Sequence, residues 1–463
     1  MYIQQLYTNC LAQAAYYIES NGEAAIIDPI RETTPYTQLA AERGAKIKYI
    51  LETHFHADFV SGHVDLAKAT GATIVYGPGT QTGFESKVAN DGELLPLGNI
   101  NLKVLHTPGH TLESSCYLLI DENGKENAVF SGDTLFVGEV GRPDLLDGIM
   151  TKEELAGMMY DSLRNKLMPL PDEVLLYPAH GPGSACGKNI GKETWSTMGQ
   201  QKQTNYALQP MSKDEFISAI SVGIPQAPAY FFEDAKMNKN GTLPLEEIER
   251  NGLQSLSIEA FENDTKSGAT ILDCRPAALF ELGFVPGSIN VGLDGQFAIW
   301  AANVLNLHTL LLLVCETGKE KEAVDRLARV GFTTMKGYLE GGFETWQNAG
   351  KRTDMVISID AEEFALDAKH SKATVLDVRK ATEQESGYVA GAKLLPLSDI
   401  QANLNELDKN QEYIIHCAGG YRSMVAASLL KSKGFQRVKN VNGGFGQIKT
   451  TDVPLEMPKA VGV

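Results

Sequence analysis

The chain has 463 residues, of which 43% are hydrophobic, and a formal net charge of −17. This length predicts about three domains. The acidic balance argues against a nucleic-acid scaffold and suits a soluble protein. We interpret the negative charge as a source of solubility and nothing more. No run approaches the roughly 20 apolar residues of a membrane span, and Met1 to Tyr7 lack the basic and apolar segments of a signal peptide.

The six cysteines lie far apart in the chain. They are Cys10, Cys116, Cys186, Cys274, Cys315 and Cys417. Such spacing in a long chain does not indicate a disulfide framework. We expect free thiols in a reducing cytoplasm.

Residues 1 to 30 read as two strands with a turn at Asn21-Gly22, and a buried strand follows at 47–51. Directly after that strand come His54, His56 and Asp58. A loop that leaves a strand end can aim alternate side chains at one point, as a metal ion requires. A polar turn with chance histidines is the alternative, but three potential ligands within five residues disfavour it.

Three further candidate ligands, His110, Asp133 and His180, each follow an apolar run, at 102–105, 128–130 and 174–176. The whole set, H-x-H-x-D, T-P-G-H, S-G-D-T and P-A-H, resembles the metallo-β-lactamase superfamily over residues 1–205. The resemblance implies an α/β fold, an αββα sandwich of two mixed sheets with helices outside. It also implies a metal in the cleft between the sheet edges.

Phe59 follows Asp58 where relatives with two zinc ions, such as glyoxalase II, carry a histidine that binds the second metal. Further on, residues 138–144 resemble the G-R-x-D segment of persulfide dioxygenases. That resemblance implies one iron(II) per chain, held by two histidines and one carboxylate with positions left open for oxygen and substrate.

The resemblance also assigns roles to single residues. The metal ligands would be His54, His110 and Asp133. Groups that orient these ligands or bound water would be His56, Asp58 and His180. Arg142 is expected to contact the anionic part of the substrate, or else to form a salt bridge with Asp144.

A capping box at residues 151–154 predicts a helix that runs to Lys166. Cys186, in the loop after His180, is either a working thiol or a small buried residue. Residues 206–257, with a second capping box and a proline-rich piece, are expected to form an ordered connector wrapped on its neighbours.

An internal repeat follows the connector. Residues 269–275, ATILDCR, match residues 373–379, ATVLDVR, and a Gly-Gly-Phe later in each copy also matches. Each copy has a second strand that ends in a cysteine before a helix. The copies, at 258–352 and 355–463, resemble the rhodanese family, which implies two small α/β domains with parallel sheets.

The second copy carries the sequence of an active rhodanese loop, Cys417-Ala-Gly-Gly-Tyr-Arg-Ser. Its small residues let backbone N–H groups surround the sulfur, and the start of a helix favours a thiolate. We expect Cys417 to carry the transferred sulfur. Substrate binding is assigned to Gly419, Gly420 and Tyr421, and Arg422 adds a charge and planar donors for sulfite or thiosulfate oxygens.

The first copy keeps the sulfur position at Cys315 but reads Cys-Glu-Thr-Gly-Lys-Glu. Carboxylates at Glu316 and Glu320 would repel sulfite and raise the pKa of a thiol. We therefore expect a structural rather than a catalytic domain.

The parts together predict a persulfide dioxygenase fused to a sulfurtransferase. Its partners would be a small persulfide, O2, sulfite and thiosulfate, with no nucleic acid and no membrane. Two alternatives remain: a glyoxalase II-like zinc thioester hydrolase with rhodanese modules, and a non-enzymatic sulfur-relay scaffold. The sequence leaves open the carrier thiol, the direction of sulfur transfer, and whether the chain forms a homo-oligomer.

Overall fold

The computed structural model describes residues 1–146 and 148–458. They divide into two compact units. The first comprises residues 1–245 with 328–331, and the second comprises residues 246–327 and the chain from 332 onward.

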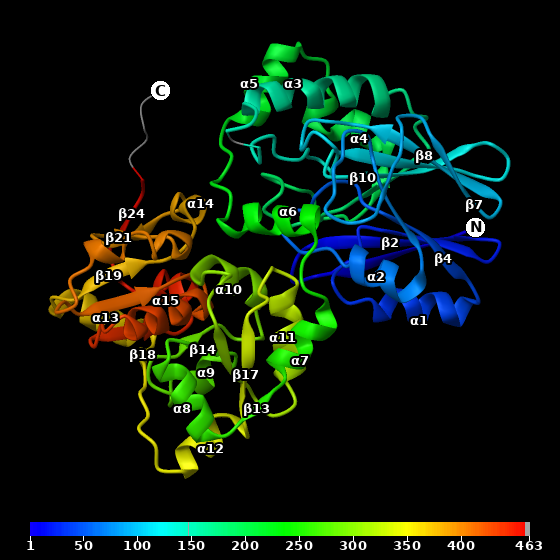
Figure 1. The fold of residues 1–463 in the computed structure, drawn as a ribbon. Helices are drawn as coiled ribbons and strands as arrows, with labels where there is room; N and C mark the ends of the chain where they lie inside the picture. Colours follow the sequence, from blue (N-terminus) through cyan, green and yellow to red (C-terminus); the bar gives the residue numbers. More distant parts are fainter. Residues whose placement is uncertain (147, 459–463) are drawn as a thin grey trace. The chain divides into compact units, whose positions relative to one another are not determined.

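Two mixed sheets lie at the centre of the first unit (Figure 1). The first sheet has the order β1 (Tyr2–Thr8), β2 (Gln13–Ser20), β3 (Glu23–Ile27), β4 (Lys46–Leu51), β5 (Thr73–Tyr76), β6 (Lys87–Val88). Strands β1 to β3 pair antiparallel, and β3 to β6 pair parallel. The second sheet has the order β12 (Ser196–Thr197), β11 (Leu175–Pro178), β10 (Glu126–Gly132), β9 (Ser115–Ile120), β8 (Ile100–His106), β7 (Leu94–Leu97). In it only β10 and β11 pair parallel.

The sheets bury their facing sides against each other. Side chains such as Ile18 and Leu51 from the first sheet pack with Leu102 and Phe130 from the second. Helices α1 (Thr34–Arg43) and α2 (His63–Thr70) pack on the first sheet, and α3 (Lys152–Ser162) covers the second (Figure 1). The α3 helix begins with the predicted capping box and continues into a π-helical turn, Leu163–Leu167. The predicted αββα sandwich is confirmed.

Much of the expected connector belongs to the first unit. After α4 (Met198–Thr204) and a 3-10 turn (Tyr206–Leu208), α5 (Lys213–Ser221) packs along α3. Its Phe216 and Ile220 are buried in the same hydrophobic cluster as Met159 of α3. Helix α6 (Tyr230–Asn240) follows, and α7 (Leu245–Gly252) leads into the second unit.

The second unit contains two sheets in which all strands are parallel. One has the order β13 (Ser255–Leu256), β17 (Met335–Leu339), β16 (Leu311–Val314), β14 (Thr270–Asp273), β15 (Ile289–Asn290). The other has the order β18 (Ile357–Ile359), β23 (Val438–Val441), β22 (Tyr413–His416), β19 (Thr374–Asp377), β21 (Lys393–Leu394). A separate antiparallel pair joins β20 (Tyr388–Val389) to β24 (Leu455–Glu456).

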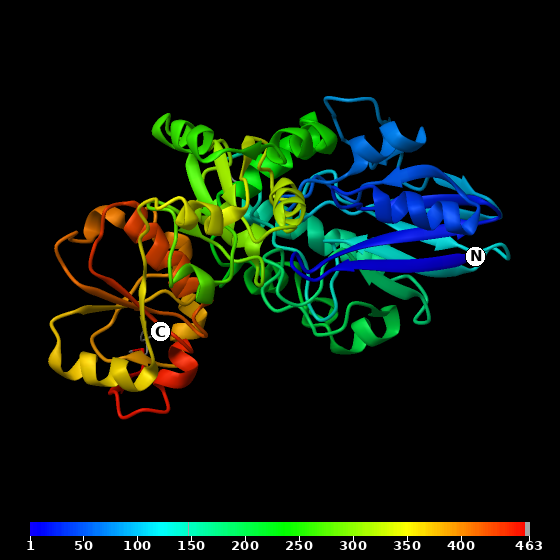
Figure 2. The ribbon, with the colours of Figure 1, turned by 90° about the horizontal axis from the view of Figure 1, so that it is seen from below.

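Helices flank both of these sheets. The first copy has α8 (Ile258–Lys266), α9 (Ala277–Phe280), α10 (Phe297–Val304), α11 (Glu320–Ala328) and α12 (Gly342–Asn348). The second has α13 (Ala361–His370), α14 (Ala381–Gln384), α15 (Tyr421–Ser432) and α16 (Gly444–Ile448), with short 3-10 turns at Leu397–Asp399 and Leu404–Glu406. Helices α13 and α16 lie side by side, yellow and red in Figure 2. The two predicted parallel α/β domains are confirmed.

The repeated Asp-x-Arg motif forms the same buried ion pair in both copies. Arg275 donates to Asp273 through Nε at 2.9 Å and Nη2 at 2.6 Å, and Arg379 does so to Asp377 at 2.9 and 2.5 Å. Each guanidinium also donates to a glycine carbonyl eight residues on. The motif therefore ties the end of a strand to the next loop.

Within the described residues, the helices are all too short or too polar to cross a membrane. All six cysteines are free thiols.

The packing of α5 on α3 predicts that Phe216→Ala destabilises the first unit by roughly 3–5 kcal/mol, because a fully buried aromatic ring is removed. Calorimetry of the full chain should show a lower melting temperature for one transition. Phe232, which is 52% exposed, provides the control, since Phe232→Ala should change that temperature little. Equal effects of the two substitutions would contradict the packing of α5.

Candidate metal and sulfur sites

Three predicted ligands meet at the ends of three strands of the first unit. His54 follows β4, His110 follows β8, and Asp133 follows β10. One ligand atom from each lies within 4.8 Å of the others, and all three residues are buried. From Asp133 Oδ2, the Nε2 atoms of His54 and His110 lie at 3.9 and 3.5 Å.

Hydrogen bonds to neighbouring groups determine which ring nitrogen of His54 and of His110 faces the centre of the cluster that they form with Asp133. Thr53 donates its hydroxyl hydrogen to Asp28, so its oxygen, 2.9 Å from His54 Nδ1, is left to accept. His110 Nδ1 lies 2.9 Å from the carbonyl of Arg142, which can only accept. Both rings therefore carry hydrogen on Nδ1 and turn the lone pair of Nε2 to the centre. Burial lowers the pKa of both histidines, which keeps the rings neutral.

The carboxylate of Asp133 has two differently placed oxygens. His180 Nδ1 lies 2.8 Å from Oδ1, while Oδ2 makes no hydrogen bond. Burial alone would raise the pKa of Asp133, but His180, His54 and His110 together hold it below its usual value. His180 also lies 2.8 Å from Asp58, and although burial lowers its pKa, these two carboxylates raise it well above the ordinary value.

A metal ion fits the convergent atoms of the first cluster. His54 Nε2, His110 Nε2 and Asp133 Oδ2 are all buried and lack a hydrogen-bond partner. Unsatisfied buried polar atoms are costly, so three that face one another indicate a missing ligand. Two imidazoles and one carboxylate form a donor set suited to iron or zinc.

His56 points away from this cluster. Its Nε2 lies 3.1 Å from Asp28 and 3.6 Å from Glu52. Burial lowers the pKa of His56, but these carboxylates raise it to about 9. The ring of Phe59 lies against His56, with 4.4 Å between ring centroids. At the position after Asp58 the chain thus has a hydrocarbon ring, which cannot bind a metal ion.

Cys186 lies beside the same loops. Its sulfur is within 4.8 Å of ligand atoms of Asp58 and His180, in a second buried group that could hold a cation. Burial, followed by the charges of Asp58 and Asp133, raises the pKa of this thiol. Both sequence interpretations of Cys186 therefore remain: the residue is buried, and it is close to polar groups.

The guanidinium of Arg142 is engaged by protein groups. It makes two hydrogen bonds to Asp144, at 2.7 and 2.8 Å, and donates to the carbonyls of Ala185 and Pro225. This is the salt bridge that the sequence offered as an alternative to substrate binding. Through its own carbonyl, Arg142 positions the His110 ring.

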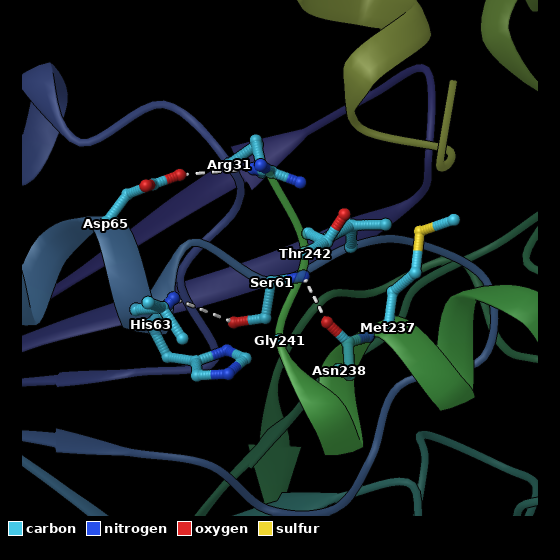
Figure 3. A pocket seen from close by; sticks show the side chains of 10 residues that line it. Arg31, Ser61, His63, Asp65, Met237, Asn238, Gly241 and Thr242 are labelled. Atoms are coloured by element: carbon cyan, nitrogen blue, oxygen red, sulfur yellow. Dashed lines mark hydrogen bonds and ion pairs between the residues drawn. The ribbon is translucent and has the colours of Figure 1, made fainter. Parts of the chain in front are cut away.

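Helix α6 packs against the loop that follows β4 and carries His54 and Asp58, which we call the metal loop. Asn238 donates from Nδ2 to the carbonyls of His56 and Phe59, both at 2.7 Å, and accepts from the Ser61 N–H at 2.8 Å. Figure 3 shows this amide aimed at Ser61, beside a small pocket that Arg31 and His63 also line. Three hydrogen bonds from one buried side chain therefore fix the loop that carries His54 and Asp58.

Asp28, Thr53 and Asn238 support the site but were not predicted from the sequence. Asp28 could have been found, because it follows β3, the parallel neighbour of β4, and such strand ends meet at one edge. Its carboxylate accepts from both the N–H and the hydroxyl of Thr53. No sequence signal points to Asn238, which lies 182 residues from His56.

In the second unit, Cys417 lies between β22 and α15, as predicted. The Gly420 N–H donates to its sulfur at 3.1 Å, and Ser423 Oγ lies 3.6 Å away. Gly420 has a left-handed φ of 107°, which glycine tolerates best. No atom would meet a Cβ on Gly419 within 4 Å. The loop thus presents a backbone donor to the sulfur.

Arg422 and Tyr421 make contacts that the sequence did not suggest. Arg422 binds both oxygens of Glu383 in α14, at 2.5 and 2.8 Å, so these donors already have an anion. Tyr421 donates its hydroxyl to the carbonyl of Gly292 in the first copy, at 2.6 Å. The loop after Cys417 is therefore anchored on both sides, and oxyanion binding by Arg422 would require Glu383 to move.

In the first copy, Cys315 follows β16 and is as buried as Cys417. Glu316 beside it is exposed and Glu320 is half-buried. The carboxylates that the sequence placed near the sulfur are therefore largely solvated.

Two family models match parts of the chain. A model described as the metallo-β-lactamase superfamily matches residues 8–180. A model described as a rhodanese-like domain matches residues 257–349 and 360–451.

Individual relatives of the first domain fall into two groups. A probable hydroxyacylglutathione hydrolase of Schizosaccharomyces pombe is 33% identical over 40% of this chain and 78% of its own length. The mitochondrial persulfide dioxygenase ETHE1 of Homo sapiens is 32% identical over 42% of this chain and 70% of its own length.

A crystal structure of a metallo-β-lactamase from Staphylococcus aureus covers 73% of this chain and 99% of its own, with 32% identity and a TM-score of 0.67.

The hydrogen bonds of Asn238 predict that Asn238→Ala weakens metal binding about 10- to 100-fold, because the loop that carries His54 loses its support. Competition with a chelator would measure this change. Asn240→Ala provides the control, since Asn240 is exposed on the same helix. Unchanged affinity in Asn238→Ala would show that the loop holds its shape without α6.

Proposed function

Since this chain belongs to the metallo-β-lactamase superfamily and carries two rhodanese-like domains behind that domain, we propose that it is a persulfide dioxygenase fused to a sulfurtransferase. The dioxygenase domain would oxidise a low-molecular-weight persulfide to sulfite and a thiol. The second rhodanese-like domain would combine sulfite with a further sulfane sulfur.

The proposal rests on the directions of the candidate metal-ligating side chains in the first unit. Three unpaired ligand atoms converge, from His54, His110 and Asp133, while His56 turns to Asp28 and Glu52. Phe59 supplies no second-site ligand, because its side chain is a hydrocarbon ring. A donor set of two histidines and one carboxylate favours a single iron(II) with open positions over a pair of zinc ions.

Residues around the cluster would hold the three metal-ligating side chains in place. Thr53 and the Arg142 carbonyl hold the two imidazoles, and His180 holds one oxygen of Asp133. Iron(II), when bound, supplies the redox chemistry with O2. Overall, one persulfide, one O2 and one water give one thiol and one sulfite. A cytoplasmic location stays a prediction.

The rhodanese step would use Cys417. Its thiolate takes the outer sulfur of a second persulfide and releases a thiol. Sulfite then attacks that sulfur, leaves as thiosulfate and restores the thiolate. The Gly420 N–H, 3.1 Å from the sulfur, would stabilise the negative charge in both forms. Tethering raises the effective concentration of sulfite at this site.

A zinc thioester hydrolase is the second candidate, and two observations favour it. Hydroxyacylglutathione hydrolases are as similar to the first domain as ETHE1 is. In addition, Asp58, His180 and Cys186 form a second buried group that could hold an ion. Metal content and oxygen uptake distinguish the two candidates.

The three converging ligand atoms predict one iron per chain in anaerobically purified protein, with oxygen uptake when a persulfide is added. His110→Ala should remove both, because one of three ligands is lost. His106→Ala, four residues earlier and bonded to the Leu112 carbonyl, should retain them. Two tightly bound zinc ions together with thioesterase activity would rule out the dioxygenase.

The Cys417 loop predicts that Cys417→Ser consumes oxygen normally but accumulates sulfite and makes little thiosulfate. Cys315→Ser should keep most of the thiosulfate yield, because the loop after Cys315 has no arginine at the position of Arg422. Both products can be followed by chromatography after a persulfide and O2 are supplied. Unchanged product ratios in Cys417→Ser would exclude thiosulfate formation there and favour transfer from thiosulfate to a thiol.

A further inference from the structure

The first rhodanese-like copy contains two cysteines at the ends of neighbouring strands. Cys274 follows β14, and Cys315 follows β16. These strands are parallel, with Asp273 opposite Val314, so the two cysteines are the next pair along the ladder. The Cys274 N–H donates to the Val314 carbonyl at 2.8 Å, which extends the pairing to this point.

This register brings the two thiols together. Residues opposite each other in a sheet direct their side chains to the same face, and neighbouring strands lie about 4.8 Å apart. A disulfide needs Cα atoms roughly 4.4 to 6.8 Å apart, so the spacing of these strands suits one. Both cysteines are buried, and the nearby Cys315 sulfur adds to burial in raising the pKa of the Cys274 thiol.

The second copy has the same backbone but only one thiol at this place. Val378 follows β19 and donates its N–H to the His416 carbonyl at 3.0 Å, as Cys274 does to Val314. Val378 thus stands beside Cys417 where Cys274 stands beside Cys315. The copy with the sulfurtransferase loop carries a hydrocarbon side chain there, and the copy without that loop carries a second thiol.

We propose that Cys274 and Cys315 form a resolving dithiol that reduces persulfide sulfur to sulfide. Cys315 attacks the outer sulfur of a low-molecular-weight persulfide, which leaves as its thiol, and Cys315 then carries a persulfide. The Cys274 sulfur attacks Cys315 Sγ, the bond to the outer sulfur breaks, and that sulfur leaves as sulfide with the Cys274 proton. Two thiols are oxidised to one disulfide, and one sulfane sulfur is reduced.

The second thiol decides the fate of the sulfur in each copy. A persulfide on Cys417 has Val378 beside it and survives until an external acceptor arrives. A persulfide on Cys315 is removed at once by its neighbour. The first copy therefore reacts once with persulfide and stays oxidised until a reductant restores it.

The two sulfur sites are also linked by hydrogen bonds through residues 292 and 293. Tyr421, in the Cys417 loop, donates to the Gly292 carbonyl, and the next residue, Leu293, donates its N–H to the carbonyl of Cys274. Oxidation of the dithiol thus occurs beside the segment that anchors the catalytic loop.

The test uses the full chain without oxygen, so that no dioxygenase reaction runs and the outcome does not depend on the metal site. Glutathione persulfide is added to Cys417→Ser protein, thiols are blocked with N-ethylmaleimide, and peptides are identified by mass spectrometry. We expect a disulfide between the Cys274 and Cys315 peptides and about one extra sulfide per chain. A stable persulfide on Cys315, or an unmodified Cys315, would overturn the proposal.

Cys274→Val, in the same background, places in the first copy the residue that the second copy has. It should stop disulfide formation, leave one additional sulfur on Cys315, and lower the release of sulfide at least tenfold. Equal sulfide release from both proteins would count against a resolving role for Cys274.

The reverse substitution tests the same idea by gain of function. Val378→Cys in the otherwise unchanged chain should trap Cys417 as a disulfide when persulfide is supplied. Sulfur transfer to sulfite should then fall at least tenfold, compared with the unsubstituted chain, and return after dithiothreitol. Full activity without a linked peptide would show that this register does not permit resolution.

Discussion

The first unit is organised around one buried carboxylate, that of Asp133. A buried charge is tolerated only when its oxygens are compensated. One oxygen is held by His180, and the other lies unpaired between His54 and His110. The ends of β4, β10 and β11 and the loop after β8 must therefore meet at one point. The order of strands in the two sheets is what brings them there.

A second layer of polar groups lies beneath this centre. Asp28 has a positive φ of 49°, which is uncommon for a residue with a side chain. In this conformation it accepts from both the N–H and the hydroxyl of Thr53, which in turn orients His54. Strained backbone of this kind persists where the surroundings over-determine it, and it often accompanies functional sites. Asn238 restrains the same loop from the opposite side.

The two rhodanese-like copies show how a frame is kept while its chemistry changes. Both keep the buried Asp–Arg pair, the parallel sheet and a cysteine after the second strand. They differ at the residue after the aspartate and in the loop after the cysteine. Because the backbone hydrogen bonds at these positions are the same, a single side chain changes what lies beside the sulfur.

Much of this protein follows from the sequence alone. Apolar runs that are followed by His54, His110, Asp133 and His180 carried the resemblance to the metallo-β-lactamase superfamily, and that resemblance implied both the sandwich and the ligand cluster. The repeat predicted two similar domains, and the glycines after Cys417 predicted a loop with backbone donors. Each of these signals is local, or repeats at a fixed interval.

Only the tertiary structure decided the partners of these groups. His56 and His54 are two residues apart, yet they face different carboxylates, and Arg422 is occupied by Glu383. Asn238 reaches the metal loop because α6 packs there. Cys274 and Cys315 are neighbours because β14 pairs with β16. Such contacts depend on register and on side-chain direction after folding, and local sequence patterns do not encode them.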